Sequence, residues 1–158
     1  MTTQPDNLIE RTALRYGPLT AGGLVLFFFL MRMIGLVHNL ELRALNLLIM
    51  TAGVVLAVRS FHRQKRRRVL YGKALGCGLL TAAVAAASFA LFTFFYLSVL
   101  DTAFMEEVIR DEPFGRYLNP FTVSLTILLE GSFSGFLISY IALQYMKGTM
   151  VEPSYANE

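Results

Sequence analysis

The stretch Phe121–Tyr145, FTVSLTILLEGSFSGFLISYIALQY, is apolar along most of its length and carries one acidic side chain, Glu130, near its middle. About 20 apolar residues at ~1.5 Å each cross the hydrocarbon core of a bilayer, so the stretch predicts a transmembrane helix. A charged group at that depth costs about 2.5–3.5 kcal/mol on insertion scales. Pairing, protonation or a functional role must therefore offset the cost of Glu130.

The rest of the chain contains three further apolar runs, at about 18–37, 42–58 and 74–100, and the fourth span is placed at 120–146. Of the 158 residues, 55% are hydrophobic and 16% are charged, and the apolar residues fall in long runs that do not alternate. This composition is typical of a membrane protein. We therefore expect an all-α membrane protein, one integral domain of four transmembrane helices in two hairpins, with Pro18 in the first turn of the first helix.

Charge is unevenly divided between the connections, and this predicts the orientation. The link 59–73 is strongly basic, whereas the link 101–119 is mainly acidic. Because positive loops stay in the cytoplasm, we expect both termini and 59–73 on the cytoplasmic side of a bacterial inner membrane. The basic residues are either only a topogenic signal or also bind anionic lipid headgroups, and nucleic acid is not expected as a partner. The candidate lipid contacts are Arg63, Lys65, Arg66, Arg67 and Arg68.

The acidic link 101–119 has a pattern of its own. Phe104, Met105, Val108 and Ile109 fall on one face of a helix, the charged residues fall on the other, and Pro113 ends the run. The pattern predicts a short amphipathic helix that lies on the membrane surface or caps the bundle. A solvated extension of the third helix is the alternative interpretation.

Three polar residues on three predicted spans fall at a similar depth: Arg32, Asn46 and Glu130. Because each alone would be costly in hydrocarbon, we expect an intramembrane cluster in which Arg32 pairs with Glu130 and Asn46 hydrogen-bonds to one of them. Such a cluster either fixes helix packing or moves protons or a small solute. In a third interpretation, Arg32 reaches outward and Glu130 is protonated or contacts a partner.

Small residues recur every fourth position on two of the spans. In lipid, close backbone approach holds helices together, so these stripes predict a tight contact between the third and fourth spans, within the chain in preference to between copies. The residues are Gly131, Gly135 and Ser139 on the fourth span and Gly78, Ala82 and Ala86 on the third.

Motifs for catalysis, nucleotide binding or metal binding are absent from the sequence. Cys77 is expected to be a small apolar filler, and His38 and His62 have no ligands at metal-binding spacing. We therefore expect no enzyme activity, no metal and no cofactor. The leading hypothesis is an accessory or scaffolding component that contacts other membrane subunits or its own copies. The alternative is an oligomeric small transporter or proton-coupled channel that uses Glu130.

Three stretches carry a resemblance to a known family: YGKALGCGLLTA at 71–82, SFALFTFFYLSVLDTAFMEEVIRDE at 88–112 and NPFTVSLTILLEGSFSGFLISYIAL at 119–143. Together with the basic link, they resemble the uncharacterised bacterial membrane family catalogued as domain of unknown function 4199. The resemblance covers about four spans, and the mid-helix glutamate is part of it. The chain departs from the family at 112–117, where a longer acidic helix would be expected. The resemblance implies the same topology and supports the importance given to Glu130 as a candidate functional residue. It implies no activity.

Overall fold

A computed structural model describes residues 5–35, 40–64, 71–111 and 114–150, and these residues form helices and short turns without a strand. Four helices are long: α1 (Pro5–Ile34), α2 (Leu40–Gln64), α3 (Tyr71–Phe95) and α5 (Pro120–Met150). One turn of π-helix, η1 (Tyr96–Leu100), continues α3 and is followed by the short helix α4 (Thr102–Asp111). A 3₁₀ turn, η2 (Gly115–Tyr117), precedes α5.

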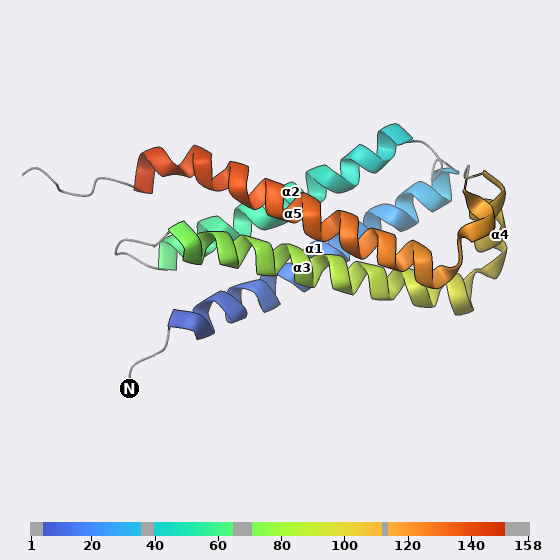
Figure 1. Cartoon of the computed structure of the whole chain (residues 1–158), viewed down its shortest axis with the longest axis horizontal. Helices are drawn as coiled ribbons and strands as arrows, with labels where there is room; N and C mark the ends of the chain where they lie inside the picture. The colour runs from blue at the N-terminus through green and yellow to red at the C-terminus, as the bar shows by residue number, and fades with distance from the viewer. Residues whose placement is uncertain (1–4, 36–39, 65–70, 112–113, 151–158) are drawn as a thin grey trace, which may run out of the picture.

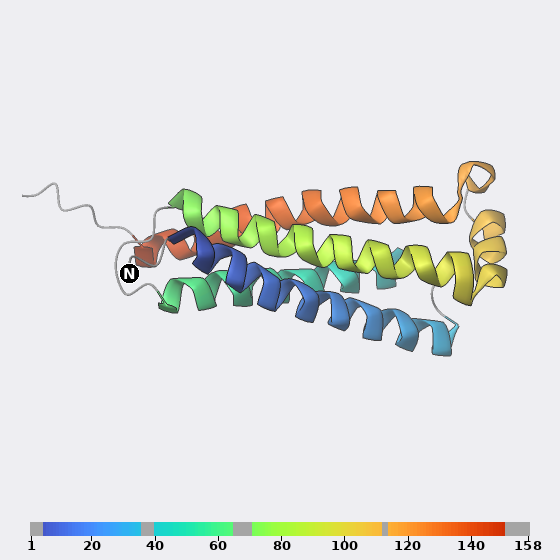
Figure 2. The ribbon, with the colours of Figure 1, turned by 90° about the horizontal axis from the view of Figure 1, so that it is seen from below.

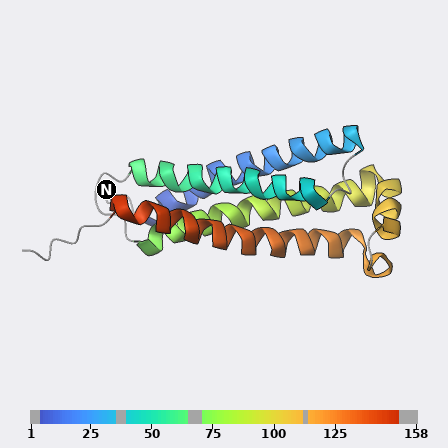
Figure 3. The same cartoon turned by 90° about the horizontal axis from the view of Figure 1, so that it is seen from above.

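The four long helices lie side by side as an elongated bundle, and α4 lies across one end of it (Figures 1 and 2). We call this end the cap end. The start of α1, the end of α2, the start of α3 and the end of α5 all lie at the opposite end, which Figure 3 also shows. The alternation of direction is the one that four successive membrane crossings require.

Each long helix contains a segment long and apolar enough to cross a membrane, namely Leu8–Ile34, Leu45–Arg63, Gly72–Leu100 and Pro120–Tyr145. The predicted fold class, an all-α protein with four transmembrane helices, is confirmed. Large apolar side chains such as Leu26, Leu91 and Phe133 are exposed on the outside of the bundle, as expected for surfaces in contact with lipid.

Two predicted boundaries need correction. The first helix begins at Pro5 and runs through Pro18, which is therefore inside the helix and not in its first turn. A proline within a membrane helix removes only one backbone donor, and neighbouring groups can compensate. The basic link 59–73 is also shorter than predicted, because α2 continues to Gln64 and α3 already begins at Tyr71. Long charged side chains are tolerated in these end turns because their heads extend beyond the apolar segment.

The predicted contact between the small-residue stripes is present, and it joins α3 to α5. A Cβ atom added to Gly131 would lie 2.8 Å from the Cβ of Ala86, and one added to Gly135 would collide with the Cβ of Ala82. One added to Gly78 would lie 2.5 Å from Oγ of Ser139. The two backbones therefore approach so closely that glycine, whose side chain is a single hydrogen atom, is required at these positions. Cys77 is fully buried beside this contact, among the apolar residues of the core.

Gly135→Ala should destabilise the bundle by about 1–3 kcal/mol, because the added methyl group has no room between α5 and Ala82. Gly22→Ala is the matched control, since a Cβ atom at Gly22 meets no atom within 4 Å. Thermal unfolding of the detergent-solubilised chain measures both. Equal midpoints for the two variants would show that close α3–α5 packing is not required.

Candidate functional site

A charged cluster fastens α4 to the cap end of α1. The guanidinium of Arg32 donates from Nη2 to Oδ2 of Asp101 at 2.9 Å and from Nη1 to Oε2 of Glu107 at 3.0 Å. Its central carbon lies 4.2 Å from the ring centre of Phe104, between the two carboxylates along the chain. One arginine therefore contacts two turns of α4, and we call this group the Arg32 clamp.

Asp101 has a second role as the N-cap of α4. Its Oδ1 accepts a hydrogen bond from the backbone N–H of Phe104 at 3.0 Å, the bond that an N-cap aspartate typically makes. Its Oδ2 also accepts from the hydroxyl of Tyr96 at 3.1 Å. The Phe104 amide, together with Arg32 and Tyr96, holds the pKa of Asp101 below its usual value. The carboxylate of Asp101 is therefore charged over the whole neutral range.

The predicted pair of Arg32 with Glu130 is replaced by these contacts. The apolar segment of α1 runs from Leu8 to Ile34, so Arg32 is two residues from its end. Glu130 comes ten residues after Pro120, where the α5 segment begins, or ~15 Å deeper along the helix axis. The sequence placed the centre of the first span too far along the chain, because the helix starts well before Pro18. Arg32 does reach toward the bundle end, as the third interpretation expected, but it meets two carboxylates there.

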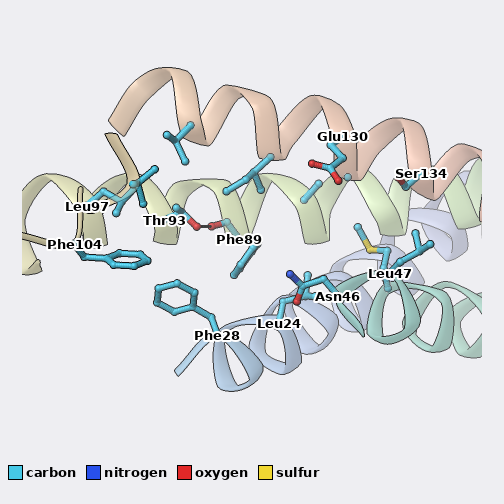
Figure 4. Close-up of a pocket in the computed structure, with 16 residues that line it drawn as sticks. Leu24, Phe28, Asn46, Leu47, Phe89, Thr93, Leu97, Phe104, Glu130 and Ser134 are labelled. Atoms are coloured by element: carbon cyan, nitrogen blue, oxygen red, sulfur yellow. Dashed lines mark hydrogen bonds between the residues drawn. The ribbon is translucent and has the colours of Figure 1, made fainter. Parts of the chain in front are cut away.

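The other two members of the predicted cluster do share a site. Asn46 from α2 and Glu130 from α5 both line a cavity of about 240 Å³ beneath α4. Figure 4 shows them extending from the two helices toward the space between. The remaining wall is largely apolar and draws on all five helices; it includes Phe28, Met50, Phe89, Phe104, Val123 and Ile127.

The polar side chains that line this cavity are those of Asn46, Thr93, Glu130 and Ser134. Oδ1 of Asn46 is shielded from solvent and has no hydrogen-bond partner among the described residues. Glu130 is exposed at the side of the cavity, between α2 and α5. The hydroxyl of Thr93 is already used, because it donates to the carbonyl of Phe89 at 2.9 Å. The arrangement can therefore receive a hydrogen-bond donor in apolar surroundings.

Other predicted residues divide between the described and undescribed parts of the chain. Arg63 is exposed in the last turn of α2, whereas Lys65, Arg66, Arg67 and Arg68 lie outside the described residues. Lipid contact by this group stays a prediction. Among the described residues, no group of three or more histidine, cysteine, aspartate or glutamate side chains could hold a metal ion.

Sequence reasoning missed Asp101 and Glu107 as the partners of Arg32. It counted them only among the charged residues of the acidic link 101–119, whereas in the structure their side chains, 22% and 39% exposed, both bind Arg32. One signal could have found Asp101. It directly precedes the amphipathic run that begins at Thr102, which is the N-cap position where aspartate is strongly preferred.

Asp101→Ala should lower stability by about 2–4 kcal/mol, because it removes both the N-cap bond and a charge-assisted bond to Arg32. Asp101→Asn keeps an N-cap acceptor and should cost about half as much. Glu106→Ala, at an exposed neighbouring position, should change little and is the control. Thermal unfolding ranks the three variants, and an Asp101→Ala midpoint equal to that of Glu106→Ala would contradict the clamp.

The lowered pKa of Asp101 also predicts how stability depends on pH. In the unfolded chain the carboxyl titrates near its usual value of about 3.9, and in the folded chain it titrates lower. Its contribution is therefore complete above about pH 4 and is lost as the pH falls through the folded pKa. The stability advantage of the wild type over Asp101→Asn should be constant near neutral pH and shrink below about pH 4. An advantage that does not change with acidification would be the contrary result.

Comparison with known proteins gives one family match. The model of a family described as "Protein of unknown function (DUF4199)" matches residues 15–112, which is 98 of the 158 residues. The matched range runs from α1 through α4, so it contains Arg32, Asp101 and Glu107 and ends before Glu130. No curated protein and no solved structure matches the chain.

Proposed function

The chain belongs to the DUF4199 family, which is described as being of unknown function, and from its geometry we propose that it is a non-enzymatic accessory or scaffolding component of a membrane assembly. The observation that supports this proposal is the exposure of Glu130 on the side of α5, well inside an apolar segment. A transmembrane segment of another subunit, with a cationic or hydrogen-bond-donating side chain at that depth, would cover it.

The surroundings of Glu130 make lipid a costly neighbour for its carboxylate. Leu129 and Phe133 on the same helix are 62% and 66% exposed, so this part of α5 forms the outer surface of the bundle. A charge facing hydrocarbon there costs about 2.5–3.5 kcal/mol, and a donor on a partner helix reduces that cost. Contact with a partner therefore gains free energy at this position beyond the packing of apolar side chains.

The shape of the chain agrees with a role inside an assembly. The helix α4, which lies outside the apolar segments, is held on the bundle by the Arg32 clamp and by burial of Phe104 and Met105. The protein therefore presents mostly membrane-embedded surface to a partner. For the orientation, we propose that the cap end faces outward from a bacterial inner membrane. Asp101, Glu106 and Glu107 lie at that end, and Arg59, Arg63 and Lys73 lie at the other.

The cavity favours a second candidate function, transport by an oligomer with Glu130 as the titrating group. Glu130 and Asn46 line the cavity. Within one chain, the close contact between α3 and α5 prevents the cavity from continuing through the bundle. Several copies would be needed to continue that space across the membrane. This candidate requires a symmetric self-assembly, whereas the accessory role requires a different protein.

Gentle solubilisation from the native membrane, followed by mass measurement of the intact complex, separates the two. We expect the wild type to emerge with another membrane protein in a fixed ratio. Glu130→Leu should lose that protein, and Glu106→Gln, exposed on α4, should retain it. A symmetric oligomer of this chain alone would favour transport, and a lone monomer would overturn the accessory role.

A further inference from the structure

The cavity beneath α4 has a closed end and an open side. Phe104 and Val108 of α4 cover it at the cap end, and Phe89 of α3 lies at its back. The helices α2 and α5 diverge toward the cap end (Figure 1), and Leu47 on the α2 side is 49% exposed. With Glu130 exposed on the α5 side, the cavity opens sideways, toward the surface that faces lipid.

One acceptor atom inside the cavity lacks a hydrogen-bond donor in the part of the chain that the structure describes. A buried acceptor without a hydrogen bond costs about 1–3 kcal/mol, and Oδ1 of Asn46 is such an atom among the described residues. The space of about 240 Å³ is many times what one water molecule needs. Its walls are mostly hydrocarbon and aromatic, so water alone would fill it poorly.

The walls restrict the kind of molecule that fits. The rings of Phe28, Phe89 and Phe104 line the cavity, and such rings pack well against another ring, edge to face or offset. Glu130 lies at the open side of the cavity, whereas Oδ1 of Asn46 is shielded from solvent. A cationic head bound at Asn46 would lose its hydration beside a neutral amide, so a neutral donor is the better match for that atom. The volume accommodates a head of about one ring, and a longer apolar tail must leave through the open side.

We propose that this cavity binds a membrane-soluble phenol, whose hydroxyl donates to Oδ1 of Asn46 and whose ring lies among the three phenylalanines. Its apolar tail passes between α2 and α5, beside Glu130, into the lipid. This site goes beyond the proposed function, because one chain forms it without any other subunit.

The test uses the purified full chain in detergent and two probes of nearly equal shape, a para-alkylphenol and its methyl ether. Only the phenol can donate a hydrogen bond. Mass measurement of the intact chain with bound probe should give about tenfold tighter binding for the phenol. Equal binding of the two probes would overturn donor recognition, and binding of neither would leave water as the occupant and overturn the proposal.

Three variants locate the site. Asn46→Leu should bind phenol and ether equally, because it removes the acceptor and keeps the volume. Ile127→Phe should weaken both probes at least tenfold, because Ile127 lines the cavity and the larger ring fills it. Leu129→Phe adds the same ring to the exposed side of α5 and should bind like the wild type. If Ile127→Phe also binds like the wild type, the probes occupy another place and the proposal fails.

Because the binding test uses the purified chain without other subunits, its result is independent of the mass measurement on the native complex.

Discussion

The close approach of α3 and α5 is the contact on which the rest of the bundle depends. Lipid tails are as apolar as leucine, so helices in a membrane gain little by burying leucine against leucine. They gain by bringing backbones close enough for many weak contacts, which here requires Gly131 and Gly135 opposite Ala86 and Ala82. Similar contacts join α1 to its neighbours, where Gly17 lies against Val84 and Gly53 lies against Thr20.

The size of the side chains changes along the bundle, and the cavity lies toward the end where aromatic side chains gather. Small residues bring the helices together in the middle and toward the termini, whereas phenylalanines fill the space toward the cap end. There Phe28 contacts Phe92, Tyr96 and Phe104 edge to face, with ring centres 5.0–6.0 Å apart. These rings hold the helices further apart than a methyl group would, and α2 diverges from α5 beside them. The cavity lies beside these rings, and α4 covers its outer end.

Most of the fold could be predicted from the sequence, because membrane-spanning runs and small-residue stripes are local patterns with known periods. The four spans, the α3–α5 contact and the short amphipathic helix follow from them.

The partner of Arg32 could not be predicted in the same way. It depends on where α1 begins, and on the π-helical turn at Tyr96–Leu100, after which Asp101 stands at the N-terminus of α4. The cavity likewise depends on how far two helices diverge, which no single segment encodes. Asn46 and Glu130 were predicted at one depth and both line the cavity, although Asn46 is one residue from the start of its apolar segment and Glu130 is ten residues from the start of its own. Depth counted along each span was therefore not what brought them together.

The Arg32 clamp also sets an order of events during synthesis. Its two carboxylates follow the arginine by 69 and 75 residues, so the ribosome finishes the first hairpin long before either partner exists. At about 5–20 residues per second, Arg32 waits on the order of 4–15 s for them. During that interval water and headgroups are the partners open to its charge, because Arg32 is two residues from the end of its apolar segment. The two bonds of Arg32 can therefore form only after the first hairpin has been synthesised, with a delay that translation sets.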